Sequence, residues 1–80
     1  MYYGYILLNE RKTRTYTGVS NDALKRLKEH NAGRIKSSKL YRPYKIIYTE
    51  SFDTLKEART KEKFYKSTTG RRRLSEMFFQ

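Results

Sequence analysis

The sequence contains no cysteine and no tryptophan, and it has one proline and one histidine among its 80 residues. The absence of cysteine excludes disulfides, thiolate metal sites and a cysteine nucleophile, and a single histidine cannot form a cluster of histidine ligands. No apolar run approaches the roughly 20 residues of a membrane-spanning helix. The opening segment lacks a basic start and a small-residue cleavage site, so we expect no secretory signal and predict a cytoplasmic location.

Acidic residues are scarce as well, with 8 Asp+Glu against 19 Lys+Arg and a formal net charge of +11. Aromatic residues are frequent, because the chain has eight tyrosines and four phenylalanines, and they favour a packed core over disorder. A chain of this length has room for one domain, so residues 1–80 are expected to form a single unit. The charge predicts a polyanionic partner.

Residue patterns predict three strands and three helices in the order β-β-α-β-α-α. The expected strands are 2–8, 14–19 and 44–50, and the expected helices are 23–31, about 54–67, and 71–79. Capping residues occur at 20–22 before the first helix and at Ser51 and Asp53 before the second. Gly70 is expected to interrupt the chain before the third. The predicted class is a small α/β fold of the α+β type, with an antiparallel sheet flanked by helices.

Basic side chains are densest between residues 31 and 45, where no acidic residue occurs. Tyr41 and Tyr44 are interleaved with them, which suits a surface that contacts phosphates and stacks on bases. A solvated loop whose lysines aid solubility is the alternative. A second cluster at 71–73 fits a phosphate contact, a targeting patch or a helix flank. The candidate nucleic-acid-binding residues of the two clusters are Arg34, Lys36, Lys39, Arg42, Lys45, Arg71 and Arg72.

One carboxylate interrupts the apolar stripe of the second predicted helix. Leu55, Ala58 and Tyr65 share one helical face, and Glu62 falls in the middle of that face by the 3.6-residue period. A carboxylate on an inward-facing stripe is costly unless it is paired or binds a cation. Glu62 is therefore a candidate functional carboxylate, with a salt bridge to a neighbouring arginine or a solvent-exposed stripe edge as alternatives.

The first predicted helix carries an arginine and a histidine four residues apart. Leu24 and Leu27 are expected to supply its apolar side, which places Arg26 and His30 on a different face. An arginine can hold a phosphate while a nearby imidazole takes a proton. An ordinary solvated face, or a histidine that interacts with the last carbonyls of the helix, would give the same spacing.

Tyrosines are concentrated on the first two predicted strands, at Tyr3, Tyr5 and Tyr16. Core or cross-strand packing is the usual role of such residues. Gly18 weakens the second strand unless another group approaches its backbone closely, although a bulge or a strand end would also explain it.

Together these positions resemble the paired motif of the GIY-YIG nuclease family. Tyr-Gly-Tyr at 3–5 is followed about ten residues later by Tyr-Thr-Gly at 16–18. The continuation through 19–33 and the stretch 57–66 are similar to small stand-alone bacterial members, which are like the N-terminal domain of excision-repair nucleases. The resemblance covers nearly the whole chain.

The resemblance implies a three-stranded antiparallel sheet and hydrolysis of a phosphodiester with one divalent ion, Mg²⁺ or Mn²⁺. It makes Tyr5 and Tyr16 the motif tyrosines. It also makes Arg26 the residue that stabilises phosphate charge, and Glu62 the metal-binding carboxylate. His30 falls where related enzymes place a tyrosine or histidine near the nucleophile.

Two residues, Tyr16 and His30, are candidates for the base that activates water. Tyr16 could act after deprotonation through Tyr5 or a metal-bound water. His30 needs less activation, because an imidazole has a pKa of about 6.5 against about 10 for a phenol. We expect Tyr16 and His30 to act in one hydrogen-bonded network. Lys66, in the matching stretch, joins the nucleic-acid-binding candidates.

The sequence thus predicts a metal-dependent endonuclease with DNA as the expected substrate, in repair, recombination or mobile-element processes. No membrane partner is expected, and a protein partner is left open as the source of specificity. Two alternatives remain. One is a basic nucleic-acid-binding module with little or no catalysis, to which Val19 in place of a family lysine points. The other is a structural protein with a basic surface.

Overall fold

The computed structural model describes residues 1–78, with side chains up to Met77. Its sheet has three strands, β1 (Tyr2–Asn9), β2 (Thr15–Ser20) and β3 (Tyr44–Phe52). The strand order is β2-β1-β3, and the central β1 pairs antiparallel with both neighbours. The predicted three-stranded antiparallel sheet is confirmed, and its strands end within two residues of the predicted positions.

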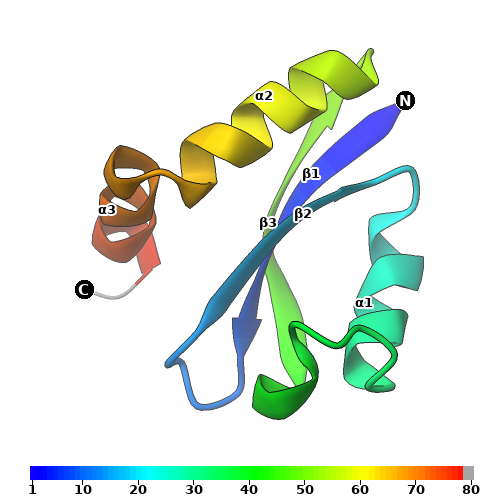
Figure 1. Ribbon diagram of the computed structural model, residues 1–80, viewed down its shortest axis with the longest axis vertical. Coiled ribbons are helices and arrows are strands. Elements are labelled where there is room, and N and C mark those ends of the chain that lie inside the picture. Colours follow the sequence, from blue (N-terminus) through cyan, green and yellow to red (C-terminus); the bar gives the residue numbers. More distant parts are fainter. Residues whose placement is uncertain (79–80) are drawn as a thin grey trace.

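The helices are α1 (Ala23–Asn31), a short 3₁₀ turn η1 (Lys39–Tyr41), α2 (Leu55–Lys66) and α3 (Thr68–Phe78). The predicted order β-β-α-β-α-α and the α+β class are confirmed. Helices α1 and α2 lie on opposite sides of the sheet, and α3 follows α2 and packs beside it (Figure 1). No helix described within residues 1–78 has the length and apolarity needed to cross a membrane.

The central strand β1 is buried on both faces. Tyr5 and Leu7 form a cluster with Ala23 and Leu27 of α1, whereas Ile6 faces α2. This alternation is the period of two expected for a strand. Because helices cover both faces, the apolar residues of β1 run continuously along the strand.

Helix α1 presents a different face to the sheet from the one predicted. Leu24 is 67% exposed, so its assignment to the apolar side is wrong. The packed face runs through Ala23, Leu27 and His30, at i, i+4 and i+7, and His30 is the buried residue of the helix. The imidazole ring of His30 therefore packs against the sheet, on a face of α1 that the leucine pattern predicted to be solvated.

Side-chain caps define where α1 and α2 begin. The Asp22 carboxylate accepts a hydrogen bond from the third residue of α1, as the predicted capping cluster allows. Helix α2 is capped by Thr54, whose hydroxyl accepts from the Glu57 N–H at 3.2 Å. The prediction of Ser51 or Asp53 as its cap is wrong, because β3 extends to Phe52 and shifts the helix start.

Gly70 lies inside α3 and does not interrupt the chain as predicted. A Cβ at this position would collide with the backbone carbonyl of Phe64 near the end of α2. The glycine therefore allows the start of α3 to pack closely against the end of α2 where the chain turns between the two helices. Leu74, further along α3, is buried.

Candidate active site

Two buried aromatic residues form the centre of the candidate site. Tyr5 on β1 is 2% exposed, and its hydroxyl oxygen lies 3.1 Å from Nε2 of the fully buried His30. Tyr5 is directly opposite Gly18 of β2 in the sheet register. A Cβ on Gly18 would stand 2.5 Å from Cζ of Tyr5 and closer still to its hydroxyl oxygen. A close approach to this glycine was one of the predicted alternatives, and it is confirmed.

The other ring nitrogen of His30 also has a buried partner. Nδ1 of His30 lies 2.6 Å from Oγ of Ser38, which is fully buried. Burial, assisted by the positive charge of Arg26, lowers the pKa of His30, so the imidazole is neutral at pH 7. Sequence reasoning missed Ser38, because nothing in the basic loop distinguishes it from its neighbour Ser37.

Tyr16 lies at the border of this network. Its ring contacts the His30 ring edge-on, with centroids 4.6 Å apart and an interplanar angle of 61°. Its hydroxyl accepts a hydrogen bond from Oγ of Ser37 at 3.3 Å, and the side chain is partly exposed. Tyr16 and His30 are thus brought together by ring contact. Within the described residues no hydrogen bond joins their polar atoms, and the imidazole bonds to Tyr5 instead.

Arg26 lies beside the buried phenol while its side chain stays 39% exposed. Burial raises the pKa of Tyr5, and the guanidinium opposes this rise through hydrogen bonding and charge. The nearby Tyr5 hydroxyl in turn raises the pKa of Arg26. Nη1 of Arg26 lies 3.6 Å from Oε1 of Glu29, and the partly exposed guanidinium is well suited to bind a phosphate.

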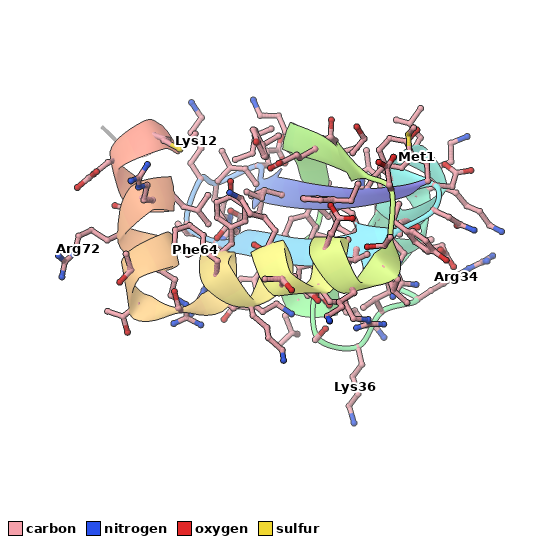
Figure 2. The ribbon with its side chains drawn as sticks, turned by 90° about the horizontal axis from the view of Figure 1, so that it is seen from above. Met1, Lys12, Arg34, Lys36, Phe64 and Arg72 are labelled. Carbon is pink, nitrogen blue, oxygen red and sulfur yellow. The ribbon has the colours of Figure 1, made fainter. Side chains whose placement is uncertain are left out.

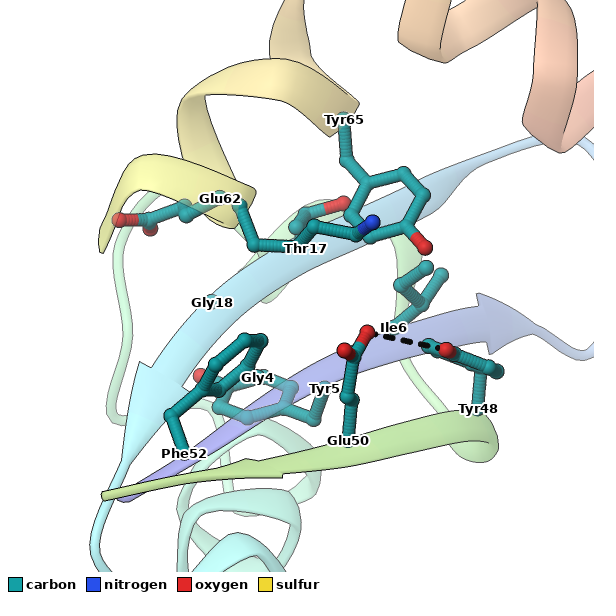
Figure 3. A pocket seen from close by; sticks show the side chains of 11 residues that line it. Gly4, Tyr5, Ile6, Thr17, Gly18, Tyr48, Glu50, Phe52, Glu62 and Tyr65 are labelled. Carbon is teal, nitrogen blue, oxygen red and sulfur yellow. Dashed lines mark hydrogen bonds between the residues drawn. The ribbon is translucent and has the colours of Figure 1, made fainter. Parts of the chain in front are cut away.

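Glu62 reaches the site from the other face of the sheet. It lies on α2 and shares a small cavity with Tyr5 and Gly18 (Figure 3). Its side chain is 17% exposed, with Oε2 3.1 Å from Nζ of Lys66 and Oε1 4.0 Å from Nη1 of Arg59. The salt-bridge alternative is therefore present in the structure. Gly18 of the edge strand β2 lines this cavity and also lies close to the Tyr5 ring.

A divalent ion in this cavity would have Glu62 as its predicted ligand, and a second carboxylate, Glu50 of β3, lines the same cavity and accepts from the Tyr48 hydroxyl at 3.0 Å. Among the residues described, no three His, Asp or Glu side chains gather closely enough to hold a metal ion. Mg²⁺ keeps several waters and binds through one or two carboxylates plus substrate phosphates, so such a site fits it. A zinc site with three or four protein ligands does not fit.

The predicted nucleic-acid-binding residues are all exposed, and they are spread over the loop between α1 and β3, strand β3, and helices α2 and α3. They are Arg34, Lys36, Lys39, Arg42, Lys45, Lys66, Arg71 and Arg72. Arg34 and Lys36 project from the loop that follows α1, whereas Arg72 projects from α3 at the opposite end of the molecule (Figure 2). A ligand that contacts both groups has to extend along the whole protein.

Two of these basic residues already have partners. Lys66 donates to Glu62, as described above. Arg42 extends over Gly33, where a Cβ would stand 2.5 Å from its Nη1, and the same nitrogen donates to the Lys39 carbonyl at 3.4 Å. The Arg42 side chain therefore connects two parts of the loop between α1 and β3, in addition to contributing positive charge.

An exposed stack of Arg14 and Tyr41 was not predicted. Cζ of Arg14 lies 4.7 Å from the centre of the Tyr41 ring, and Nη2 donates to the Tyr41 hydroxyl at 3.3 Å. The neighbouring Leu40 is 86% exposed. The sequence separates Arg14 widely from η1, so only the fold brings the hairpin turn and η1 together.

The amino-acid sequence is similar to those of known proteins. Residues 1–75 match the GIY-YIG catalytic domain. The chain is 41% identical over 59 residues to UPF0213 protein YazA of Bacillus subtilis, covering 72% of this chain and 60% of that protein. It is 37% identical over 70 residues to UPF0213 protein RBAM_000440 of Bacillus velezensis, covering 86% and 70%. The match to UPF0213 protein lmo0166 of Listeria monocytogenes is 46% over 52 residues, covering 64% and 58%.

The chain thus spans 58–70% of the length of these three relatives. No solved structure gives a significant match. The match to the catalytic domain nevertheless runs from the first strand into the third helix, through every element of the site described above. The chain belongs to the GIY-YIG catalytic domain family.

Proposed function

We propose that this protein is a metal-dependent endonuclease that hydrolyses phosphodiester bonds of DNA, with residues 1–80 as one nuclease domain. One face of the sheet groups two phenols, an imidazole and a guanidinium, and a carboxylate reaches the same edge from α2. These side chains are Tyr5, Tyr16, His30, Arg26 and Glu62. This grouping carries the proposal, and family membership supports a nucleic-acid substrate. Repair, recombination and mobile-element processes all use such an activity.

The scissile phosphate would bind between Arg26 and Glu62. The guanidinium of Arg26 is accessible and remains charged, so it can donate to a non-bridging oxygen and stabilise the charge that grows in the transition state. Glu62 would hold Mg²⁺ or Mn²⁺, and the ion, when bound, supplies positive charge that stabilises the leaving 3′ oxygen. Glu62 has to exchange its contact with Lys66 for this role.

Tyr16 would hold the attacking water in line with the phosphate. Its hydroxyl is reachable from solvent, whereas His30 is fully buried and cannot contact a water at the surface. His30 would then act behind Tyr5, by accepting the Tyr5 hydroxyl proton over their 3.1 Å hydrogen bond as Tyr5 takes up the proton that the water releases, while its ring contact with Tyr16 positions that ring. The imidazole is the stronger base of the three groups, so it is the natural end point for a proton.

The exposed basic residues would bind the sugar-phosphate backbone without reading base sequence. They extend from the loop that follows α1 to α3 at the opposite end of the molecule, which favours an extended substrate over a short one. A protein partner would add sequence choice.

Cleavage of matched DNA substrates tests the proposal. Nicked, branched, single-stranded and duplex forms of one sequence would be incubated with the protein and Mg²⁺ or Mn²⁺. We expect Glu62→Gln to abolish metal-dependent cleavage and Arg26→Ala to slow it about 100-fold. Glu76→Gln removes the same charge from an exposed position on α3 and serves as the matched control. Cleavage at the wild-type rate by Glu62→Gln would refute the assignment.

One observation favours a second function, a basic nucleic-acid-binding module without catalysis. Both oxygens of Glu62 face cations of its own helix, so the carboxylate already has partners. Binding would then survive Glu62→Gln and weaken steeply with added salt, as expected for phosphate contacts. A product whose formation depends on Glu62 excludes this reading.

A further inference from the structure

Ser38 is a fully buried polar residue in an otherwise exposed, basic loop. Its backbone is held on both sides, because its N–H donates to the Ile35 carbonyl at 3.2 Å and its own carbonyl accepts from the Tyr44 hydroxyl at 2.9 Å. The side-chain oxygen is 2.6 Å from Nδ1 of His30. A buried hydroxyl is costly without a hydrogen-bond partner, so the fold holds this one at the imidazole.

The contact bears on which nitrogen of His30 carries the proton. A neutral imidazole has one N–H, so one ring nitrogen donates and the other accepts. With the proton on Nδ1, His30 donates to Ser38 and accepts the O–H of Tyr5 at Nε2. With the proton on Nε2, His30 donates to the Tyr5 oxygen, and the Tyr5 proton has to point elsewhere.

Two observations favour the proton on Nδ1. Oγ of Ser38 lies 3.4 Å from the Ile35 carbonyl, which can accept the serine proton and leave Oγ free to accept from His30. On the other side, Nε2 of His30 is the one hydrogen-bond partner of the Tyr5 hydroxyl among the described residues, so in the Nε2–H form the buried Tyr5 proton would have no acceptor. The Tyr5 hydroxyl therefore directs its proton to Nε2.

We propose that Ser38 is a positioning residue that holds His30 in its Nδ1–H form, so that Tyr5 donates its hydroxyl proton to Nε2. Without the hydroxyl, the buried Nδ1–H loses its partner and the Nε2–H form becomes competitive. The Tyr5 proton then has no acceptor at Nε2. The inference deepens the proposed nuclease function and rests on it, because the Tyr5–His30 pair is the one that would take up the proton of the attacking water.

The imidazole nitrogens can be observed directly. His30 is the only histidine, so a long-range ¹H–¹⁵N spectrum contains one set of imidazole signals. At neutral pH we expect a protonated Nδ1 and an unprotonated Nε2. Ser38→Ala should shift the population toward Nε2–H, and Ser38→Thr should keep the wild-type pattern. Tyr44→Phe is the matched control, because it removes the bond to the Ser38 carbonyl and leaves the Ser38 hydroxyl in place.

A proton on Nε2 in the wild-type spectrum overturns the proposal, and this result needs no variant to fold. A folded Ser38→Ala protein that keeps Nδ1–H overturns it as well. In cleavage assays, Ser38→Ala should lower kcat about tenfold with KM unchanged, and Ser38→Thr should restore it. The expected spectra together with no cleavage of any DNA would support the hold of Ser38 on His30 and refute the nuclease function, so the two failures are distinguishable.

Discussion

Gly18→Ala adds one methyl group at the most crowded point of the candidate site. The new Cβ would stand 2.5 Å from Cζ of Tyr5, a buried ring whose hydroxyl also bonds to His30. Overpacking of this kind costs about 1–3 kcal/mol. Losing the Tyr5–His30 hydrogen bond adds about 1 kcal/mol. Alanine regains about 0.5–1 kcal/mol of backbone entropy relative to glycine, so we expect a net loss of about 1–3 kcal/mol.

Urea unfolding measures this loss, and Gly4→Ala is the matched control. Gly4 is also on the sheet, but a Cβ there would stand 3.3 Å from Cε2 of Phe52, a partly exposed ring that can move. The control should change the free energy of unfolding by less than about 1 kcal/mol in either direction. In a domain of this size, each kcal/mol lost from Gly18→Ala should lower the Tm by about 4–8 °C.

The two variants together test the steric reasoning. Equal stability of Gly18→Ala and Gly4→Ala would show that Tyr5 moves away from β2 without cost. The close approach would then have no energetic role. A destabilised Gly18→Ala protein with an unchanged His30 environment would locate the strain elsewhere in the sheet.

Three further outcomes are expected. The free energy of unfolding should fall as the pH drops below about 6.5, because folding lowers the pKa of His30 and the unfolded chain therefore binds the proton first. The loss for one proton is at most about 1.4 kcal/mol per pH unit. A free energy of unfolding that stays constant from about pH 7 to 5 in urea titrations would contradict this. Lys66→Met should strengthen Mn²⁺ binding to the free protein roughly 1.4- to fivefold, measured by electron paramagnetic resonance, because an exposed pair with Glu62 contributes about 0.2–1 kcal/mol. Asn31→Ala should cost about 2 kcal/mol in urea unfolding, because the Asn31 amide bonds both the N–H and the C=O of Tyr44, at 2.7 and 3.0 Å.

Much of the fold could be predicted because local patterns and tertiary packing agree. The continuous apolar run at 5–8 matches a central strand covered on both faces, and Asp22 marks the start of α1. The corner between α2 and α3 could not be predicted. Gly70 usually signals an interruption, and only the approach of the Phe64 carbonyl explains a glycine inside the helix.

The sequence indicated the residue types of the candidate site better than their surroundings. The face of α1 was misjudged because Leu24 is as apolar as Leu27, and the packed residue that distinguishes the face is a histidine. Ser38 carried no signal, since its burial depends on contacts with residues distant in the sequence. Contacts between segments that are distant in the sequence decide whether such residues are buried. The periodicity of apolar residues within one helix or strand carries no information about these contacts.

The division of the site between the two faces of the sheet has a consequence for incomplete molecules. The phenols and imidazole depend on α1, whereas the carboxylate of Glu62 arrives on α2, late in the sequence. In a nascent or partly opened chain, one of these helices can pack on the sheet before the other. Such a chain then has either the phenols and imidazole without the Glu62 carboxylate, or the carboxylate without them. Under the proposed nuclease function, cleavage would therefore begin only after the contacts of both helices with the sheet have formed, which would spare nucleic acids from half-folded chains.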